Sequence, residues 1–172
     1  VDASVGGKTG INFNGLKNEI GVFSPAEYVL IETEFLKTLD TQNLLSGYAE
    51  MLKHALISTT RHWAELLNFD MNHIDYKMLQ TLVAESVQIK ENIVEQDPFE
   101  KGIRKALNLG HTVGHAFESL ALETNRPVLH GYAVAWGIVC ELYFSYLKTG
   151  FPKDKLRQTI QFIKDNYGVF AF

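Results

Sequence analysis

Cysteine is almost absent from this sequence, because Cys140 is the single cysteine among 172 residues. One cysteine excludes an internal disulfide framework and favours a reducing compartment. Apolar residues do not gather in any run long enough to span a bilayer, and no signal peptide is recognisable. We therefore expect a cytoplasmic protein that has no membrane partner.

Positive charge is not in excess either. The 16 lysine and arginine residues are outnumbered by 20 acidic residues, and the formal net charge is −4 at pH 7. This balance gives no support to nucleic acid as a partner. The apolar share of 46% and the charged share of 21% are typical of a globular domain. The chain opens at Val1, without methionine, in a glycine-rich segment, which we interpret as the start of a fragment.

Local patterns change near residue 38. Residues 1–24 predict loops with a short hairpin, and the apolar run Tyr28–Ile31 predicts a strand. Thr33 is a candidate cap of a short helix, and beyond it apolar residues recur at helical spacing. The predicted helices cover about 41–58, 61–68, 76–96, 131–148 and 153–166, with one more around Gly110. The sequence therefore predicts a mainly α fold, with loop and strand in 1–38 and helices in 39–172.

The stretch LNLGHTVGHAFE, residues 107–118, combines histidine with glycine. In a helix, His111 and His115 lie one turn apart on one face. Gly110 and Gly114 are costly there, because glycine in a helix interior loses roughly 1 kcal/mol relative to alanine. We therefore expect these glycines to allow the close approach of another backbone or of a ligand.

A metal site is one of two interpretations of the histidines. His130 begins another predicted helix, and histidines from two helices with one carboxylate would form a three-ligand site with an open position, as in catalytic zinc sites. The alternative is a set of satisfied core or surface histidines. Glu50 and Lys53 are favoured as an exposed ion pair. The remaining histidines have no comparable neighbours in the sequence: His54, His62 and His73.

Several cationic residues lie where they could meet an anion. The segment GGKT at 6–9 resembles a phosphate loop, but Asp2 stands where that motif needs glycine, so a nucleotide P-loop is excluded. Lys8 on glycine-rich backbone remains a candidate, and Lys17 repeats the chemistry. Lys90 and Arg104 could bind a carboxylate or phosphate. Taken singly, each is an ordinary surface residue.

In combination, the motifs resemble the 3-dehydroquinate synthase family of sugar-phosphate cyclases. The matching stretches occur in the family's order: VDASVGGKTGIN, GLKNEIGVF, SGYAEMLKHALI, QIKENIVEQDPFEKGIRKALNLGHTVGHAFE and LHGYAVAWG. The resemblance implies the multi-helix, metal-binding C-terminal domain of that fold, truncated at its C-terminus. It also implies that residues 1–38 are a strand or hairpin remnant of a preceding α/β domain.

The resemblance also assigns roles to individual residues. The implied metal ligands are Glu50, His111 and His130, with zinc as the usual metal and cobalt as a substitute. The implied catalytic residues are His115, Lys53, Asp2 and Glu100. The implied substrate-binding residues are Lys8, Lys17, Asn18, Lys90, Arg104 and Asn108. Lys8 and Asn18 would hold a phosphate, Lys90 and Arg104 a carboxylate, and His115 would relay a proton.

The implied reaction belongs to the shikimate pathway of aromatic amino acid biosynthesis. A phosphate lyase converts 3-deoxy-D-arabino-heptulosonate 7-phosphate to 3-dehydroquinate and phosphate, by means of the metal and of NAD bound mainly by the preceding domain. We expect the full-length protein to be a cytoplasmic homodimer and this chain alone to be inactive.

Other functions remain open. A related cyclase would make an aminocyclitol or valiolone precursor, and a polyol dehydrogenase of the glycerol dehydrogenase type would stop after hydride transfer. A non-enzymatic helical interaction domain is the third class. Tyr132 stands where most members of the family have glutamate, and the loop between His115 and His130 is slightly long, so the exact substrate stays undecided.

Overall fold

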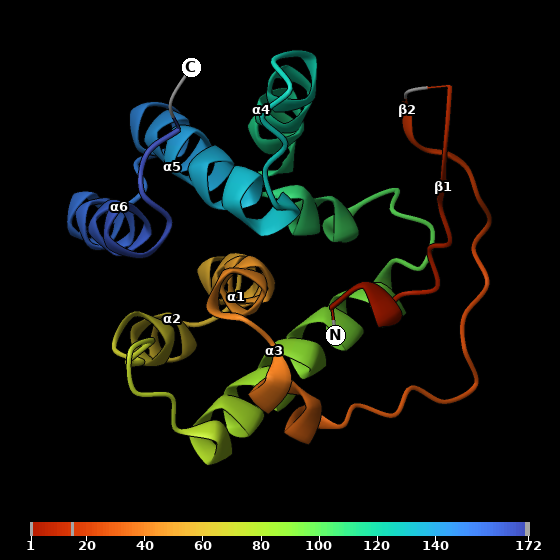
Figure 1. Ribbon diagram of the computed structural model, residues 1–172, viewed down its shortest axis with the longest axis horizontal. Helices are drawn as coiled ribbons and strands as arrows, with labels where there is room; N and C mark the ends of the chain where they lie inside the picture. The colour runs from red at the N-terminus through yellow and green to blue at the C-terminus, as the bar shows by residue number, and fades with distance from the viewer. Residues whose placement is uncertain (1, 15, 171–172) are drawn as a thin grey trace.

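Helices form most of the molecule (Figure 1). The computed structural model describes residues 2–14 and 16–170. Its α-helices are α1 (Thr41–Leu56), α2 (Thr60–Leu67), α3 (Tyr76–Gln96), α4 (His111–Glu123), α5 (His130–Thr149) and α6 (Lys153–Tyr167). Short 3₁₀ helices are η1 (Asp2–Ser4), η2 (Thr33–Thr38) and η3 (Ile103–Asn108), and an antiparallel hairpin joins β1 (Ile11–Phe13) to β2 (Leu16–Ile20). The predicted mainly α fold class is confirmed.

The helix boundaries follow from local capping. The side chain of Asp40 accepts a hydrogen bond from the backbone N–H of Asn43 at the start of α1, and Asp75 does the same for two N–H groups of α3. Such caps satisfy amide groups that have no partner within the helix. Gly168 ends α6 with a φ of 68°, a left-handed conformation that favours glycine. The predicted starts of α1 at 41 and of α3 at 76 are confirmed.

Several local predictions are wrong. Thr33 is the first residue of η2, and its cap is Glu32, whose side chain accepts from the N–H of Glu34. The segment Tyr28–Ile31 is extended but forms no strand, and Tyr28 and Leu30 are 82% and 96% exposed. A strand needs a neighbour for its backbone hydrogen bonds, and within the described residues the single sheet is the β1–β2 hairpin. Gly110 does not lie inside a helix either. It precedes the first residue of α4 with a φ of 81°.

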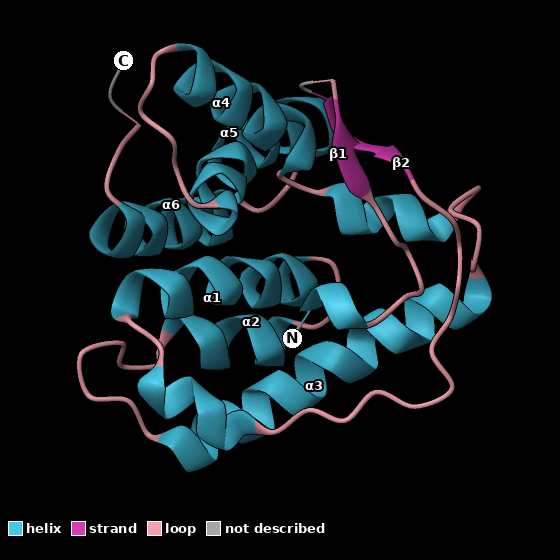
Figure 2. Ribbon diagram, turned by 45° about the vertical axis from the view of Figure 1, so that its right-hand side comes forward, coloured by secondary structure: helices cyan, strands magenta, loops and turns pink. Residues whose placement is uncertain are grey.

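The long helix α5 packs against α4, α1 and α6 (Figure 1). Helix α1 packs against α5 on one side and against α2 and α3 on the other, so that α1 is covered from several directions. The hairpin lies outside this helical body (Figure 2), and the segment after it contacts the loop beyond α3 through the rings of Phe23 and Phe99. Among the described residues, no helix is both long and apolar enough to cross a membrane.

Helices α4 and α5 meet with their backbones in contact. A Cβ added to Gly114 would lie 3.0 Å from the carbonyl oxygen of Ala133, and one added to Gly137 would overlap the carbonyl oxygen of Gly110. The prediction that Gly110 and Gly114 allow close approach of another backbone is therefore confirmed.

Helices α1 and α5 meet in the same way. The backbone N–H of Gly131 donates to the hydroxyl of Ser46 at 3.0 Å, and a Cβ on Gly131 would overlap the carbonyl oxygen of Ser46. Because α1 carries Glu50, α4 begins at His111 and α5 begins at His130, these two glycine contacts set the relative positions of all three residues.

Candidate active site

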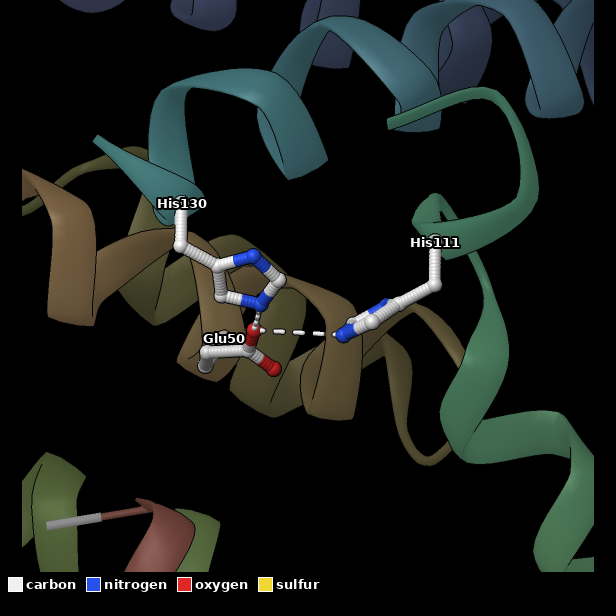
Figure 3. Close-up of side chains that lie close together, drawn as sticks. All are labelled: Glu50, His111 and His130. Atoms are coloured by element: carbon white, nitrogen blue, oxygen red, sulfur yellow. Dashed lines mark ion pairs between the residues drawn. The ribbon is translucent and has the colours of Figure 1, made fainter. Parts of the chain in front are cut away.

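Glu50, His111 and His130 converge on one point (Figure 3). The Nε2 atoms of His111 and His130 lie 3.5 Å and 3.2 Å from the same carboxylate oxygen, Oε1 of Glu50. Two tetrahedral ligands at about 2.1 Å from a zinc ion are themselves about 3.4 Å apart. The donor atoms therefore already have the spacing of metal ligands, and their chemistry suits a divalent transition metal.

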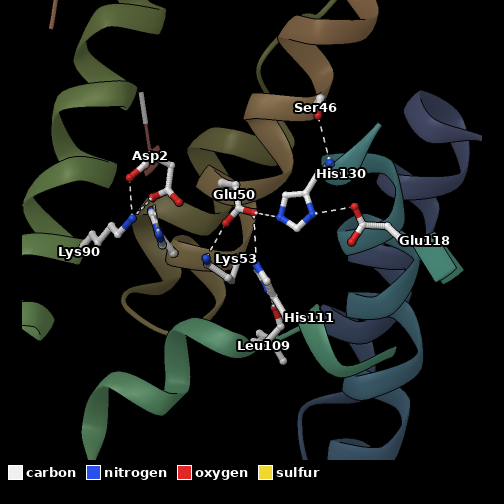
Figure 4. Close-up of polar contacts among 12 residues, drawn as sticks. Asp2, Ser46, Glu50, Lys53, Lys90, Leu109, His111, Glu118 and His130 are labelled. Atoms are coloured by element: carbon white, nitrogen blue, oxygen red, sulfur yellow. Dashed lines mark hydrogen bonds and ion pairs between the residues drawn. The ribbon is translucent and has the colours of Figure 1, made fainter. Parts of the chain in front are cut away.

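The Nδ1 atom of His111 and that of His130 each face a partner that fixes a proton on this nitrogen. His111 Nδ1 lies 3.3 Å from the carbonyl oxygen of Leu109, and His130 Nδ1 lies 3.2 Å from a carboxylate oxygen of Glu118 (Figure 4). Both partners can only accept, so Nδ1 carries a proton in each ring. Each Nε2 faces Oε1 of Glu50, and after loss of its proton its lone pair would point at the position of a metal, as in many metal sites with histidine ligands.

The carboxylate of Glu50 is buried and has a cationic partner on its other oxygen. Glu50 and Lys53 are 7% and 3% exposed, and the Lys53 ammonium lies 2.5 Å from Oε2 of Glu50. The interpretation of this pair as an exposed ion pair is wrong, because α1 is covered by helices on opposite sides. Lys53 binds Oε2, while Oε1 faces the two histidines.

Charge coupling at this site shifts two pKa values. Burial alone would raise the pKa of Glu50, but hydrogen bonds from His111 and His130 and the charge of Lys53 outweigh it, so that this pKa lies well below its usual range. The hydrogen bond to Glu118, followed by that to Glu50, raises the pKa of His130 to about 9. A metal ion at this site would take the place of the proton on His130 Nε2.

A cavity of about 590 Å³ opens beside the two histidines. It collects most of the site residues predicted from the sequence. The predicted residues among its lining are Asp2, Lys8, Lys53, Lys90, Glu100, Arg104, Asn108, His111, His115 and His130.

The cationic side chains of this cavity are close enough to repel one another. Partial burial lowers the pKa of Lys8, and the positive charges of Arg104, Lys90 and Lys53 lower it further. An anionic ligand in the cavity would relieve this repulsion and accept charge-assisted hydrogen bonds. The arrangement therefore fits a ligand with phosphate or carboxylate groups.

The same cations now hold the N-terminal segment. Lys90 Nζ donates to the backbone carbonyl of Asp2 at 2.5 Å, and Arg104 donates to the carbonyl oxygens of Gly6 and Pro98, both at 2.7 Å. Lys8 forms an ion pair with Glu100. These contacts tie residues 2–8 to the helical body, where they form one wall of the cavity.

Glu100 is held in an uncommon conformation. Its φ is 58°, which is rare for a residue other than glycine, and its Oε1 accepts a hydrogen bond of 2.6 Å from the side-chain amide of Asn108. Backbone strain of this kind is found at functional sites. It places the Glu100 carboxylate between Asn108 and Lys8.

His115 lies beside the proposed ligands. Its ring centroid is 5.5 Å from that of His111 and 6.0 Å from that of His130, and its side chain is exposed to the cavity. It also forms a second candidate ligand group with Glu118 and His130. For Lys17 and Asn18 the backbone lies in β2, and their side chains lie outside what the structure describes.

The sequence did not single out His54, Ser86 or Glu118 as site residues. His54 Nδ1 lies 2.7 Å from the hydroxyl of Ser86, and His54 Nε2 lies 3.3 Å from Oδ1 of Asp2. In the sequence His54 has no neighbours comparable to those of His111, and the structure places Ser86 and Asp2 beside it. A signal was present in the spacing, because His54 follows Glu50 by four residues and Ser86 precedes Lys90 by four.

His54 should make the free energy of unfolding of the protein depend on pH. Burial lowers its pKa from 6.5 to about 4, in spite of the nearby Asp2. The unfolded chain then binds a proton between pH 6.5 and 4 that the folded chain excludes, so the free energy of unfolding falls as pH falls through this range. We expect a loss of about 3 kcal/mol from this group, measured by urea unfolding at pH 7 and pH 4.

The variant His54→Gln supplies the control for this pH effect. Its stability should fall by about 3 kcal/mol less than that of the parent over the same range, because glutamine does not titrate. If the free energy of unfolding of His54→Gln fell between pH 7 and pH 4 by as much as that of the parent, the assignment to His54 would be contradicted.

Comparisons with known proteins give a consistent result. Residues 47–170 match the family model described as 3-dehydroquinate synthase C-terminal, and residues 1–46 match the one described as 3-dehydroquinate synthase N-terminal. A 3-dehydroquinate synthase from Parabacteroides distasonis is 58% identical over all of this chain and 49% of its own length. One from Streptococcus pyogenes is 40% identical over 94% of this chain and 44% of its own. The chain thus spans about half the length of these curated relatives.

Solved structures share the fold at low sequence identity. A 2-deoxy-scyllo-inosose synthase in complex with carbaglucose-6-phosphate, NAD⁺ and Co²⁺ superimposes with a TM-score of 0.81 at 23% identity, over 97% of this chain and 46% of that one. A 2-epi-5-epi-valiolone synthase from Streptomyces hygroscopicus, with NAD⁺ and Zn²⁺ bound, gives a TM-score of 0.70 at 24% identity, over 97% and 54%.

Proposed function

This chain belongs to the 3-dehydroquinate synthase family, and from that membership we propose that it forms the metal- and substrate-binding part of such an enzyme. The enzyme would convert 3-deoxy-D-arabino-heptulosonate 7-phosphate to 3-dehydroquinate and phosphate. One observation carries the proposal: a single cavity combines two histidines of the Glu50–His111–His130 triad with a wall of four cationic side chains. The 58% identity to a relative of that name supports the choice among cyclases.

Glu50, His111 and His130 are the residues that would hold a divalent metal, which we propose to be zinc or cobalt. Zn²⁺ and Co²⁺ are the ions named for two solved structures of this fold, which supports the choice. When bound, such an ion polarises a substrate hydroxyl and lowers its pKa, and bound NAD accepts the hydride from the carbon that carries this hydroxyl.

The anionic groups of the substrate would bind to the cationic wall. We propose that Lys8 binds the phosphate and that Lys90 with Arg104 binds the carboxylate. Arg104 uses two of its donors on the carbonyl oxygens of Gly6 and Pro98, which keeps the guanidinium in place, and a guanidinium has further donors for a ligand. Several steps occur in one bound molecule, so orientation is a large part of this catalysis.

Two further residues would handle hydroxyl groups and protons. Lys53 holds Oε2 of Glu50, and its ammonium also faces the cavity, where it would donate to a substrate hydroxyl. His115 lies at the same wall, close to the two ligand histidines, and we propose it as the residue that relays a proton.

The test is an assay of phosphate release by the full protein that carries this chain, supplied with NAD and zinc or cobalt. We expect the heptulosonate phosphate to give equal amounts of phosphate and 3-dehydroquinate without net formation of NADH. Turnover of sedoheptulose 7-phosphate instead would indicate a related cyclase. NADH formation from glycerol without phosphate release would indicate a polyol dehydrogenase.

A pair of lysine variants tests the cationic wall in the same assay. Lys8→Met should lower kcat/KM by about 10- to 100-fold, because a hydrogen bond to a charged group contributes about 1.5–3 kcal/mol. Lys101→Met serves as the matched control, since Lys101 is exposed and lies outside the lining of the cavity. Equal kcat/KM values for the two variants would contradict phosphate binding by Lys8.

A further inference from the structure

A chain of polar groups leads from the interior to the wall of the cavity. It runs from Ser86 on α3 through His54 on α1 to Asp2 in η1. The side chains of His54 and Ser86 are almost inaccessible, at 2% and 3% exposure of the residue. His54 Nε2 and Asp2 Oδ1 are buried 3.3 Å apart without the geometry of a full hydrogen bond. Because buried polar atoms without such a bond cost free energy, this contact needs a physical account.

The surroundings of His54 would suit an apolar side chain. A second cavity of about 180 Å³ lies beside it, lined largely by apolar side chains, among them Leu44, Met51, Leu79 and Val83. A leucine at position 54 could pack against these groups, but it would leave the buried Ser86 hydroxyl without its partner. The presence of histidine therefore points to its contacts with Ser86 and Asp2.

The partners of the ring decide where its proton lies. The Asp2 carboxylate can only accept, so Nε2 of His54, 3.3 Å away, carries the proton. Nδ1 then accepts a hydrogen bond from the Ser86 hydroxyl at 2.7 Å. His111 and His130 differ from His54, because their Nδ1 atoms face acceptors and carry a proton.

Asp2 Oδ1 is contacted from two sides. Besides His54, the Lys90 ammonium lies 3.0 Å from this oxygen, and it also donates to the backbone carbonyl of Asp2. Figure 4 shows Asp2 and Lys90 on one side of Glu50, with His130 and Glu118 on the other. Because Glu50 and His54 are one turn apart on α1, a single helix sets both the proposed metal ligand and the position of the Asp2 carboxylate.

We propose that His54 is a positioning residue, whose imidazole is oriented by Ser86 and donates its Nε2 proton to Asp2, so that the Asp2 carboxylate is held where it meets a hydroxyl of the substrate. The part that concerns Asp2 and substrate rests on the proposed function. The part that concerns the tautomer of His54 and its dependence on Ser86 does not.

The tautomer can be measured without any assay of activity. In protein with ¹⁵N-labelled histidine, two-bond proton–nitrogen spectra should show His54 with a protonated Nε2 and an unprotonated Nδ1. Ser86→Ala should shift the Nδ1 resonance, whereas Thr81→Ala, an exposed hydroxyl on the same helix, should leave it unchanged. A proton on Nδ1, or a spectrum insensitive to Ser86→Ala, would overturn the proposal.

The link to Asp2 requires kinetics of the full protein that carries this chain. His54→Leu should lower kcat by about 10- to 100-fold, the range known for residues that orient another active-site group, with a much smaller change in KM. His54→Gln places an amide N–H near the position of Nε2 and should recover most of that loss. Equal losses in both variants, or a parental kcat in His54→Leu, would overturn the positioning role.

Two controls separate this proposal from the proposed function. The thermal midpoint of each variant shows whether it is folded, and Ser86→Ala, which retains His54, should lower kcat by less than His54→Leu does. If the parent protein releases no phosphate from any cyclase substrate, the proposed function fails. The NMR measurement of the His54 tautomer in the parent and in Ser86→Ala then still decides whether Ser86 orients His54.

Discussion

Glu50→Gln is expected to lower the affinity for Zn²⁺ or Co²⁺ by more than 100-fold and to abolish phosphate release. Loss of a partner that only orients a metal ligand costs about 10- to 100-fold in affinity, and removal of an anionic ligand itself should cost more. Glutamine keeps the shape of the side chain but removes the charge on which His111 and His130 converge. Calorimetric titration of metal into chelator-treated protein measures the effect.

The same variant should also destabilise the protein. Lys53 is buried and its ammonium lies 2.5 Å from Glu50, so Glu50→Gln leaves a buried charge without its carboxylate. Breaking such a pair costs about 3–5 kcal/mol. Adding Lys53→Met to Glu50→Gln should recover stability and leave metal binding lost. The two effects are thereby separated.

Glu65→Gln is the matched control for this prediction. Glu65 pairs with the exposed Arg61 on α2, at a distance of 2.8 Å, and such surface pairs contribute at most about 1 kcal/mol. The Glu65→Gln variant should bind metal at the triad with the same affinity as the parent protein. Parental metal affinity in Glu50→Gln would show that this triad is not the metal site.

Gly131→Ala is expected to destabilise the protein by about 2–3 kcal/mol and to weaken metal binding. The added Cβ would overlap the backbone carbonyl of Ser46, and a backbone group cannot rotate away as a side chain can. Overpacking of this kind typically costs about 1–3 kcal/mol. Since it separates α1 from α5, it should also lengthen the 3.2 Å distance between Glu50 Oε1 and His130 Nε2. Chemical denaturation and metal titration measure the two effects.

Gly47→Ala, on α1, provides the comparison. A Cβ added there meets nothing within 4 Å, and alanine is favoured over glycine in a helix by about 1 kcal/mol. This variant should therefore be slightly more stable than the parent and bind metal equally well. If both alanine variants lost stability to the same extent, close contact of the two backbones would not be the reason for Gly131.

The sequence predicted the helices well because their signals are local. Spacing of apolar residues located α1 and α3, and Asp40, Asp75 and Gly168 marked boundaries through their own hydrogen bonds or backbone conformation. The segment at 28–31 shows the limit of such signals. Its composition favours a strand, but strand formation depends on a partner, and composition carries no information about that partner.

The site was predictable only in part from local pattern. Spacing within one helix relates Glu50 to Lys53, but it cannot tell that α5 covers one side of α1 while α2 and α3 cover the other. Burial turns what resembled a surface ion pair into a shielded carboxylate. The assignment of Glu50 as a metal ligand came from the family motifs, and the structure brings it within 3.5 Å of both histidines.

His130 and His111 are each the first residue of a helix, α5 and α4. The peptide dipoles of a helix sum to roughly half a positive charge at its amino end. At the start of α4 the backbone N–H groups of Gly110 and Val113 donate to the carboxylate of Glu141, which offsets that charge, so the field beside Glu50 comes mainly from the start of α5. This field favours an anionic oxygen, such as the alkoxide of an ionised substrate hydroxyl, and does not vary with pH. The acidity of a hydroxyl bound there would thus depend partly on the direction in which α5 runs.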